Sequence, residues 1–301
     1  MKHIVSVSLG SSTRDHRVEV NFFNEKFIIE RIGMDGDYNK FINTLKMLDG
    51  KVDAIGMGGI NLFLPVRNHT YKIRSAKPLV KAVTKTPVAD GSCLRRTLEP
   101  HAALTINQKG IVDFHGKKVM ITCAVDRYSL SEALVSLGCS IICADLIFVL
   151  GIPLVIKSLN TLNRVARMFA PIITKLPFDM LYPTGHREEK VEDPYKFARF
   201  YHDADIIAGD FNYIKRYMPD NLKNKIVITN TVTKENIEEL QSRGVSILVT
   251  TTPEFEGRSF GTNVIEALIV AILGKPAEKI TNEEYISICT KLGFEPRVIM
   301  F

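Results

Sequence analysis

The sequence predicts an α/β protein in which a Rossmann-like, doubly wound parallel sheet follows a smaller mixed α/β domain. Six apolar runs after residue 113 alternate with helical segments. These runs are continuously apolar, which is typical of strands buried on both faces. The first run leads into a helix and then into a second strand with an acid at its end, an order found in dinucleotide-binding folds. The 301 residues are enough for two domains.

The first predicted domain, residues 1–113, combines a small sheet with helices packed on it. HIVSVSLG and VEVNFFNEKFIIERI are predicted strands, with a hairpin turn at FNEK. A helix is expected over residues 35–49, because Phe41, Leu45 and Leu48 recur at helical spacing. A buried strand then runs into Gly58 and Gly59, which allow a ligand or the other domain to come close.

The second predicted domain, residues 114–301, carries the parallel sheet. Strands are expected at 117–125, 139–147, 178–183, 204–211, 225–231 and 245–252. The closing helices should pack back on this sheet or on the first domain. The last of them is expected to be capped by Thr281, with Glu284 three residues on.

The composition excludes several classes of protein. Hydrophobic residues make up 46% and charged residues 24%, with neither a secretory signal nor a bilayer-spanning run, so we expect a cytoplasmic protein that meets no membrane. The net charge of +6 is spread out, which excludes a general nucleic-acid surface and favours a small anionic ligand. Five cysteines and scattered histidines predict free thiols and no metal site. A homodimer is compatible with these features.

The turn in CAVDRYSLSEAL lacks the glycines of a dinucleotide fingerprint. Ala124, Asp126 and Ser129 stand in their places, and Asp145 lies where a carboxylate would bind the ribose of NAD. Asp126 would repel a pyrophosphate unless Arg127 turned into the site. Three alternatives follow: the usual NAD or NADP pose, an altered nucleotide pose, or no dinucleotide, with Asp126 as a helix N-cap.

The other strand ends supply further candidates, because ligands of doubly wound sheets bind outside the carboxyl ends of the strands. Cofactor contacts are predicted at four residues: Thr229, Asn230, Thr251 and Thr252. The polar loop 251–263 supplies five substrate- or anion-binding candidates: Glu254, Arg258, Ser259, Thr262 and Asn263. The alternative is a well-capped surface loop.

The first domain offers a substrate clamp and an acid/base group. Arg95 and Arg96 are adjacent on a helix, so at most one points into a cleft, where Arg95 would hold a carboxylate. Asp90 or His186 would accept the proton released when an alcohol gives up a hydride. The alternatives are helix capping for Asp90, a solvated arginine, and an exposed loop histidine.

Three stretches carry a resemblance to a known family: CAVDRYSLSEALVSLGCSIICADLIFVLGIP, ADIIAGDFNYIKRYMP and TTTPEFEGRSFGTNVIEA. They resemble a bacterial family identified as quinate 5-dehydrogenases, over most of the chain. The order of domains is similar to that of shikimate and quinate dehydrogenases, which implies an oxidoreductase. The motif around the catalytic lysine and aspartate of shikimate dehydrogenases is not found in this sequence.

Three functions remain open on the sequence. The first is an NAD(P)-dependent oxidoreductase acting on a small hydroxylated, quinate- or shikimate-like carboxylic acid. The second is a non-redox protein that binds a ligand or handles a nucleotide or metabolite, on the same fold with a degenerate dinucleotide turn. The third, a scaffold, fits the crowded polar loops least well. The sequence does not decide whether the chain is an enzyme.

Overall fold

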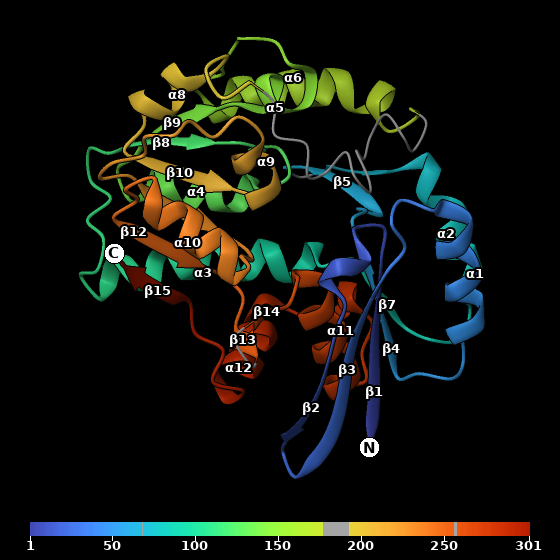
Figure 1. Cartoon of the computed structure of the whole chain (residues 1–301). Coiled ribbons are helices and arrows are strands. Elements are labelled where there is room, and N and C mark those ends of the chain that lie inside the picture. The colour runs from blue at the N-terminus through green and yellow to red at the C-terminus, as the bar shows by residue number, and fades with distance from the viewer. Residues whose placement is uncertain (68, 177–192, 256–257) are drawn as a thin grey trace.

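The chain folds into two lobes, each built on a mainly parallel sheet covered by helices (Figure 1). The structure is a computed structural model that describes residues 1–67, 69–176, 193–255 and 258–301. It confirms the mixed α/β class and the layout in two domains. The two sheets use residues 2–89 and 118–300; the boundary between residues 113 and 114 stays a prediction.

The N-terminal sheet has the order β2-β3-β1-β4-β7, and only β2 is antiparallel to its neighbour. Its strands are β1 (Lys2–Ser8), β2 (His16–Phe22), β3 (Glu25–Gly33), β4 (Ala54–Gly58) and β7 (Val88–Ala89). Phe23 and Asn24, both at positive φ, make the predicted hairpin turn. One core of this lobe forms where α1 (Tyr38–Leu48) and α2 (Lys77–Ala82) meet the sheet. The short hairpin of β5 (Phe63–Val66) and β6 (His69–Lys72) forms a separate two-stranded sheet.

The C-terminal sheet has the order β15-β12-β11-β10-β8-β9. Its strands are β8 (Lys118–Ile121), β9 (Ser140–Cys143), β10 (Ile206–Gly209), β11 (Ile226–Thr229), β12 (Ile247–Thr250) and β15 (Arg297–Met300). Burial on both faces is confirmed, because Met120 and Ile207 belong to one core whereas Val119 and Ala208 belong to another. The helices among these strands are α4 (Tyr128–Ser136), α5 (Asp145–Leu150), α6 (Leu159–Ile173), α8 (Ala198–Asp203), α9 (Phe211–Arg216) and α10 (Lys234–Ser242).

Several strand predictions differ from the structure. The strands expected over 117–125 and 139–147 end early, at Ile121 and Cys143, and α5 begins at Asp145. The sixth strand of the sheet is the unpredicted β15, which pairs antiparallel with β12. The strand expected at 178–183 lies outside the described residues.

Within the described residues, the chain passes between the lobes three times. The first passage is α3 (Ser92–Gln108), which lies between the two lobes in Figure 1. The second runs through the hairpin of β13 (Glu254–Phe255) and β14 (Arg258–Ser259) into α11 (Thr262–Leu273) and α12 (Asn282–Lys291), and the third leads to β15. Helix α11 packs on β1 and β4 of the N-terminal sheet, which explains why it is apolar nearly all round. The predicted capping box of Thr281 and Glu284 is confirmed.

The first two passages touch at Gly91. Its φ is +83°, and a Cβ there would lie 2.5 Å from both Asn263 N and Thr262 Oγ1, so only glycine fits. Buried Glu266 accepts hydrogen bonds from the amides of Gly91 and Leu94, each at 2.7 Å. Burial raises the pKa of Glu266 to about 7.

No helix in the described ranges has both the length and the apolar character needed to cross a membrane. The cytoplasmic location and the homodimer stay predictions.

Candidate functional site

A cavity of about 200 Å³ lies in the cleft between the lobes. The carboxyl ends of β1, β4, β10 and β11 all reach it. The N-terminal lobe lines it with Ser8, Arg14, His16, Arg31, Gly58 and Gly59, the C-terminal lobe with Asp210, Phe211, Asn212, Asn230, Thr231, Val232, Thr233 and Asn236, and the second passage with Phe260, Gly261, Asn263 and Val264. In open parallel sheets this edge is where ligands bind.

The N-terminal wall of the cavity is cationic. The guanidinium of Arg31 donates to Asp15 Oδ1 at 2.9 Å and to Ser8 Oγ at 3.1 Å, which fixes its position. The His16 ring packs against the ring of Phe260, with centroids 5.4 Å apart. Its Nε2 is buried and has no hydrogen-bond partner among the described residues. Arg14 completes this wall.

The C-terminal wall is centred on Asp210. Its Oδ1 accepts from the Asn212 amide at 3.0 Å, and its Oδ2 accepts from Asn230 Nδ2 at 3.1 Å. Arg127 Nη2 lies 3.4 Å from the same Oδ2. The charge of Asp210 is therefore partly balanced from within its own lobe.

In the turn that replaces the glycine-rich fingerprint, backbone amides are hydrogen-bonded to a side chain of the protein itself. The Asp145 carboxylate, expected on a ribose, instead accepts from the amides of Ala124 and Val125 at 3.1 and 2.9 Å. Burial raises the pKa of Asp145 to about 6, against the opposing effect of these amides. Helix α4 begins at Tyr128, and its N-cap residue is Arg127, so the interpretation of Asp126 as the N-cap is wrong. Ser129 lies in the first turn of α4.

Asp126 belongs to a buried ion network that joins the lobes. Its Oδ2 lies 3.2 Å from Arg95 Nη1 and 3.1 Å from Arg127 Nη1, and its Oδ1 accepts from Asn61 Nδ2 at 3.1 Å. Arg127 Nε also lies 3.3 Å from Glu99 Oε1. Arg95, Arg127 and Glu99 are all buried. We call these five residues the interlobe network.

The arginine expected to hold a substrate carboxylate is used inside this network. Arg95 turns inward, where Asp126 and the Asn61 side chain bind it. Arg96 instead donates to Cys93 Sγ at 3.3 Å. A substrate carboxylate at Arg95 would have to displace Asp126.

The other predicted site residues are buried or bond within the protein. Asp90 accepts from the amides of Leu62 and Ser92 and from the Ser92 hydroxyl, while the N-cap residue of α3 is Gly91. Thr252 Oγ1 donates to the Asn230 carbonyl, and Thr229 Oγ1 donates to Asn230 Oδ1. Thr251 and Thr262 are buried.

Two predicted residues line the cleft cavity: Asn230 and Asn263, whose Nδ2 also donates to Ser6 Oγ at 2.6 Å. His186 lies outside the described residues, and so do the side chains of Glu254, Arg258 and Ser259.

The prediction missed the charged residues of the cavity. Arg14, His16, Arg31 and Asp210 were not among the predicted site residues. A signal existed, because Arg31 stands near the end of a predicted strand and Asp210 at the end of another. Reading the strand ends of the N-terminal sheet as closely as those of the second would have found Arg31.

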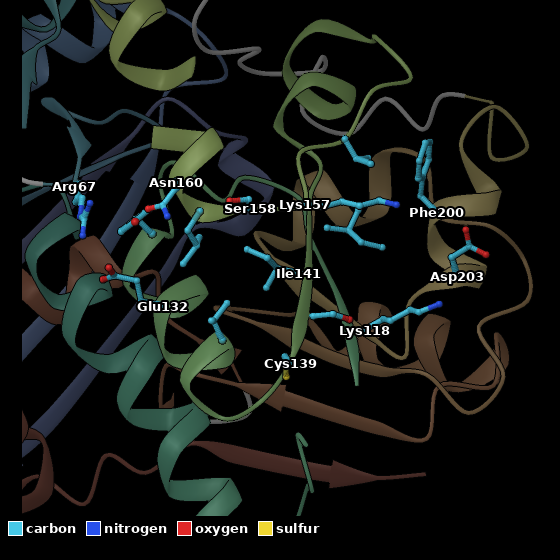
Figure 2. Close-up of a pocket in the computed structure, with 16 residues that line it drawn as sticks. Arg67, Lys118, Glu132, Cys139, Ile141, Lys157, Ser158, Asn160, Phe200 and Asp203 are labelled. Carbon is cyan, nitrogen blue, oxygen red and sulfur yellow. The ribbon is translucent and has the colours of Figure 1, made fainter. Parts of the chain in front are cut away.

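A larger hollow of about 770 Å³ runs beside the edge strand β9. Figure 2 shows its charged side chains in two groups, with Lys118, Lys157 and Asp203 toward one end and Arg67 and Glu132 at the other. Ile141 lies between them. Because these polar groups do not converge, the interlobe cavity is the better candidate.

The described side chains contain no cluster of three or more His, Cys, Asp or Glu residues that could hold a metal ion.

The fold and site define a two-lobed α/β protein with a polar cleft. The chain belongs to the family of the domain of unknown function DUF8754, whose model matches residues 93–301. A second model, of the domain of unknown function DUF8753, matches residues 3–90. A search of curated proteins found no match.

Among solved structures, the chain is similar to a glucose-galactose binding protein from Geobacillus stearothermophilus (12% identity, TM-score 0.41, 99% of this chain and 97% of that one). It is also similar to an ABC transporter solute binding protein from Burkholderia multivorans (11% identity, TM-score 0.37, 99% of this chain and 98% of that one). A third similar structure is a myo-inositol binding protein from Caulobacter (10% identity, TM-score 0.35, 99% of this chain and 93% of that one).

The leading functional prediction, an NAD(P)-dependent oxidoreductase acting on a hydroxylated carboxylic acid, is corrected. The solved structures named above are sugar- and solute-binding proteins. The physical reason lies in the turn, where Asp145 and Asp126 bind the protein's own amides and arginines. NAD or NADP as a cofactor stays a prediction.

Proposed function

We propose that this chain binds a small polar molecule in the cleft between its lobes. The observation that carries the proposal is the cavity itself, where polar side chains from both lobes converge at the carboxyl ends of four strands. The non-redox, ligand-binding alternative raised by the sequence fits this geometry.

The strand orders support a Rossmann-like, doubly wound description of both lobes. The parallel strands β9-β8-β10-β11-β12 follow the order 2-1-3-4-5 of one doubly wound type, and β3-β1-β4-β7 follow its first four positions. In such sheets the crevice beside the first strand is the ordinary ligand position. In this molecule the N-terminal crevice, at the ends of β1 and β4, opens on the cavity, whose C-terminal wall lies at the ends of β10 and β11.

The volume limits the ligand. The cavity of about 200 Å³ lies below the roughly 300–1,000 Å³ of drug-sized sites and holds about seven waters' worth of liquid volume. A dinucleotide is far larger than this. A compact metabolite with several hydrogen-bonding groups suits the polar walls.

The test combines thermal shift and calorimetry over a panel of sugars, polyols, hydroxy acids and amino acids. A ligand of the cleft should raise Tm and bind about 2- to 10-fold more weakly to Asn212→Ala, because one hydrogen bond is lost. Asn43→Ala, which removes an exposed asparagine of α1 in the other lobe, is the matched control and should bind like the unchanged protein.

Two outcomes would overturn the proposal. One is no binding across the panel. The other is micromolar binding of NAD or NADP that Asp145→Asn abolishes and Asn212→Ala leaves intact, since this would return the site to the turn.

A further inference from the structure

We infer that the ligand of the cleft is a small organic anion that carries a hydrogen-bond donor, with its acidic group against Arg14, His16 and Arg31 and its donor against Asp210. This inference rests on the proposed function, because it assigns a ligand class and an orientation to the same cavity.

The charges on the two walls differ. Two guanidiniums and one carboxylate line the cavity among the described residues, and both guanidiniums come from the N-terminal lobe. One partner of Arg31, Asp15, is exposed and is not part of the lining. The carboxylate of Asp210 has Arg127 behind it at 3.4 Å. The described N-terminal wall therefore presents positively charged guanidiniums to the cavity, which favours an anion there.

The cationic wall is built before any ligand arrives. Arg31 is held by Ser8 and Asp15, and its side chain is only 13% exposed. A guanidinium fixed in this way binds a carboxylate or phosphate with little loss of side-chain entropy. His16 adds a buried ring nitrogen without a hydrogen-bond partner among the described residues, beside the apolar ring of Phe260. A ligand oxygen could satisfy this nitrogen.

The C-terminal wall favours a different ligand group, because it presents a carboxylate. Asp210 is an acceptor only, so it favours a hydroxyl or an ammonium group over a second acid. The side chains of Asn212 and Thr231 lie beside it and can donate or accept. A ligand with an acid at one end and a donor at the other therefore matches both walls, whereas a dianion with acids at both ends does not.

The test uses matched ligands that differ in one group. Glucose, glucuronate and glucose 6-phosphate form one set, and glycerol, glycerate and glycerol 3-phosphate form a smaller set. Calorimetry on the full chain should show that one acidic member binds at least tenfold more tightly than its neutral parent. The carboxylate and phosphate members then tell which acid the wall takes.

The variants locate the acid. Arg14→Gln and Arg31→Gln should each weaken the acidic ligand at least tenfold and change the neutral parent by less than twofold. Arg17→Gln is the matched control, because Arg17 lies on the same lobe and is exposed at 56%, where it pairs with Glu19. Should Arg31→Gln unfold by circular dichroism, Arg14→Gln carries the test.

The outcomes separate this inference from the proposed function. Equal binding of neutral and acidic members, weakened by Asn212→Ala, overturns the anion and keeps the cleft. Absence of any binding overturns both. An equal loss in Arg17→Gln and Arg14→Gln also overturns the inference, since the effect would then be general surface charge.

Discussion

The turn at residues 122–127 and the interlobe cavity both lie at the carboxyl ends of parallel strands, and both combine aspartate with arginine. In the turn, Asp126 meets two arginines and an asparagine within 3.2 Å. In the cavity, Arg31 and Asp210 stand on opposite walls with a void of about 200 Å³ between them. The charged groups of the turn contact one another directly. Those of the cavity are separated by a space that a ligand could fill.

The difference comes from the partner that each strand end meets. Helix α3 brings Arg95 and Glu99 to the turn, and the loop after β4 brings Asn61. Their charges and amide fill the position where a doubly wound sheet would hold phosphate. The turn is part of the contact between the lobes, and the neighbouring ends of β10 and β11 line the cavity.

The largest effect is expected from Arg127→Met. This change leaves the buried Glu99 and the partly buried Asp126 and Asp210 near one another without their shared cation, so the free energy of unfolding should fall by about 3–5 kcal/mol. Urea denaturation measures it. Arg164→Met, an exposed arginine of α6, should cost less than about 0.5 kcal/mol. A loss of that small size in Arg127→Met would mean that the network is not structural.

The next prediction tests whether Arg95 and Asp126 stabilise the protein as an ion pair or as two independent charges. A double-mutant cycle of Arg95→Met and Asp126→Leu should give a coupling energy of about 1–3 kcal/mol, because the two side chains are in contact and mostly buried. Thermal or urea unfolding of the four proteins supplies it. Additive losses would show that Arg95 and Asp126 do not act together, and Arg95 would again be a candidate for a ligand carboxylate.

The third prediction concerns how the free energy of unfolding depends on pH through Glu266, which lies where the first two passages between the lobes touch. The folded-state pKa of Glu266, about 7, lies above its unfolded value, so the native state binds an extra proton between these values. Its contribution to stability is complete below about pH 4.5 and is lost as pH rises through about 7, by roughly 3 kcal/mol. Asp145, with a pKa of about 6, acts in the same direction.

Glu266→Gln isolates this contribution. Unfolding curves from pH 4 to pH 8 should show a smaller decline of stability with rising pH than in the unchanged protein. Asn43→Ala should keep the full decline. An unchanged slope in Glu266→Gln would assign the pH dependence to other groups.

The sequence predicted local and periodic features well, and long-range partners poorly. Continuous apolar runs located five of the strands in the C-terminal sheet, because burial on both faces leaves its mark in each strand separately. Strand β15 was missed, since four residues near the chain end become a strand only by pairing with β12.

The site depended still more on distant partners. The spacing of Asp145 is right for a ribose, yet its bonds to the amides of residues 124 and 125 appear only once the turn is folded. Likewise, Asp126 looks exposed to a cofactor until Arg95, 31 residues earlier, is brought beside it.

The smallest expected effect on stability completes the comparison between the turn and the cavity. Asn212→Ala and Thr231→Ala change side chains that face the cleft, and each should alter the free energy of unfolding by less than about 0.5 kcal/mol. Asn61→Ala removes an amide of the interlobe network and should cost about 1–3 kcal/mol, because Asp126 and Arg95 both lose a hydrogen bond. Urea denaturation of the three variants measures the contrast. A side chain that makes few contacts within the protein contributes little to the free energy of unfolding. Equal losses in all three variants would therefore show that Asn212 and Thr231 stabilise the fold as much as the interlobe network does.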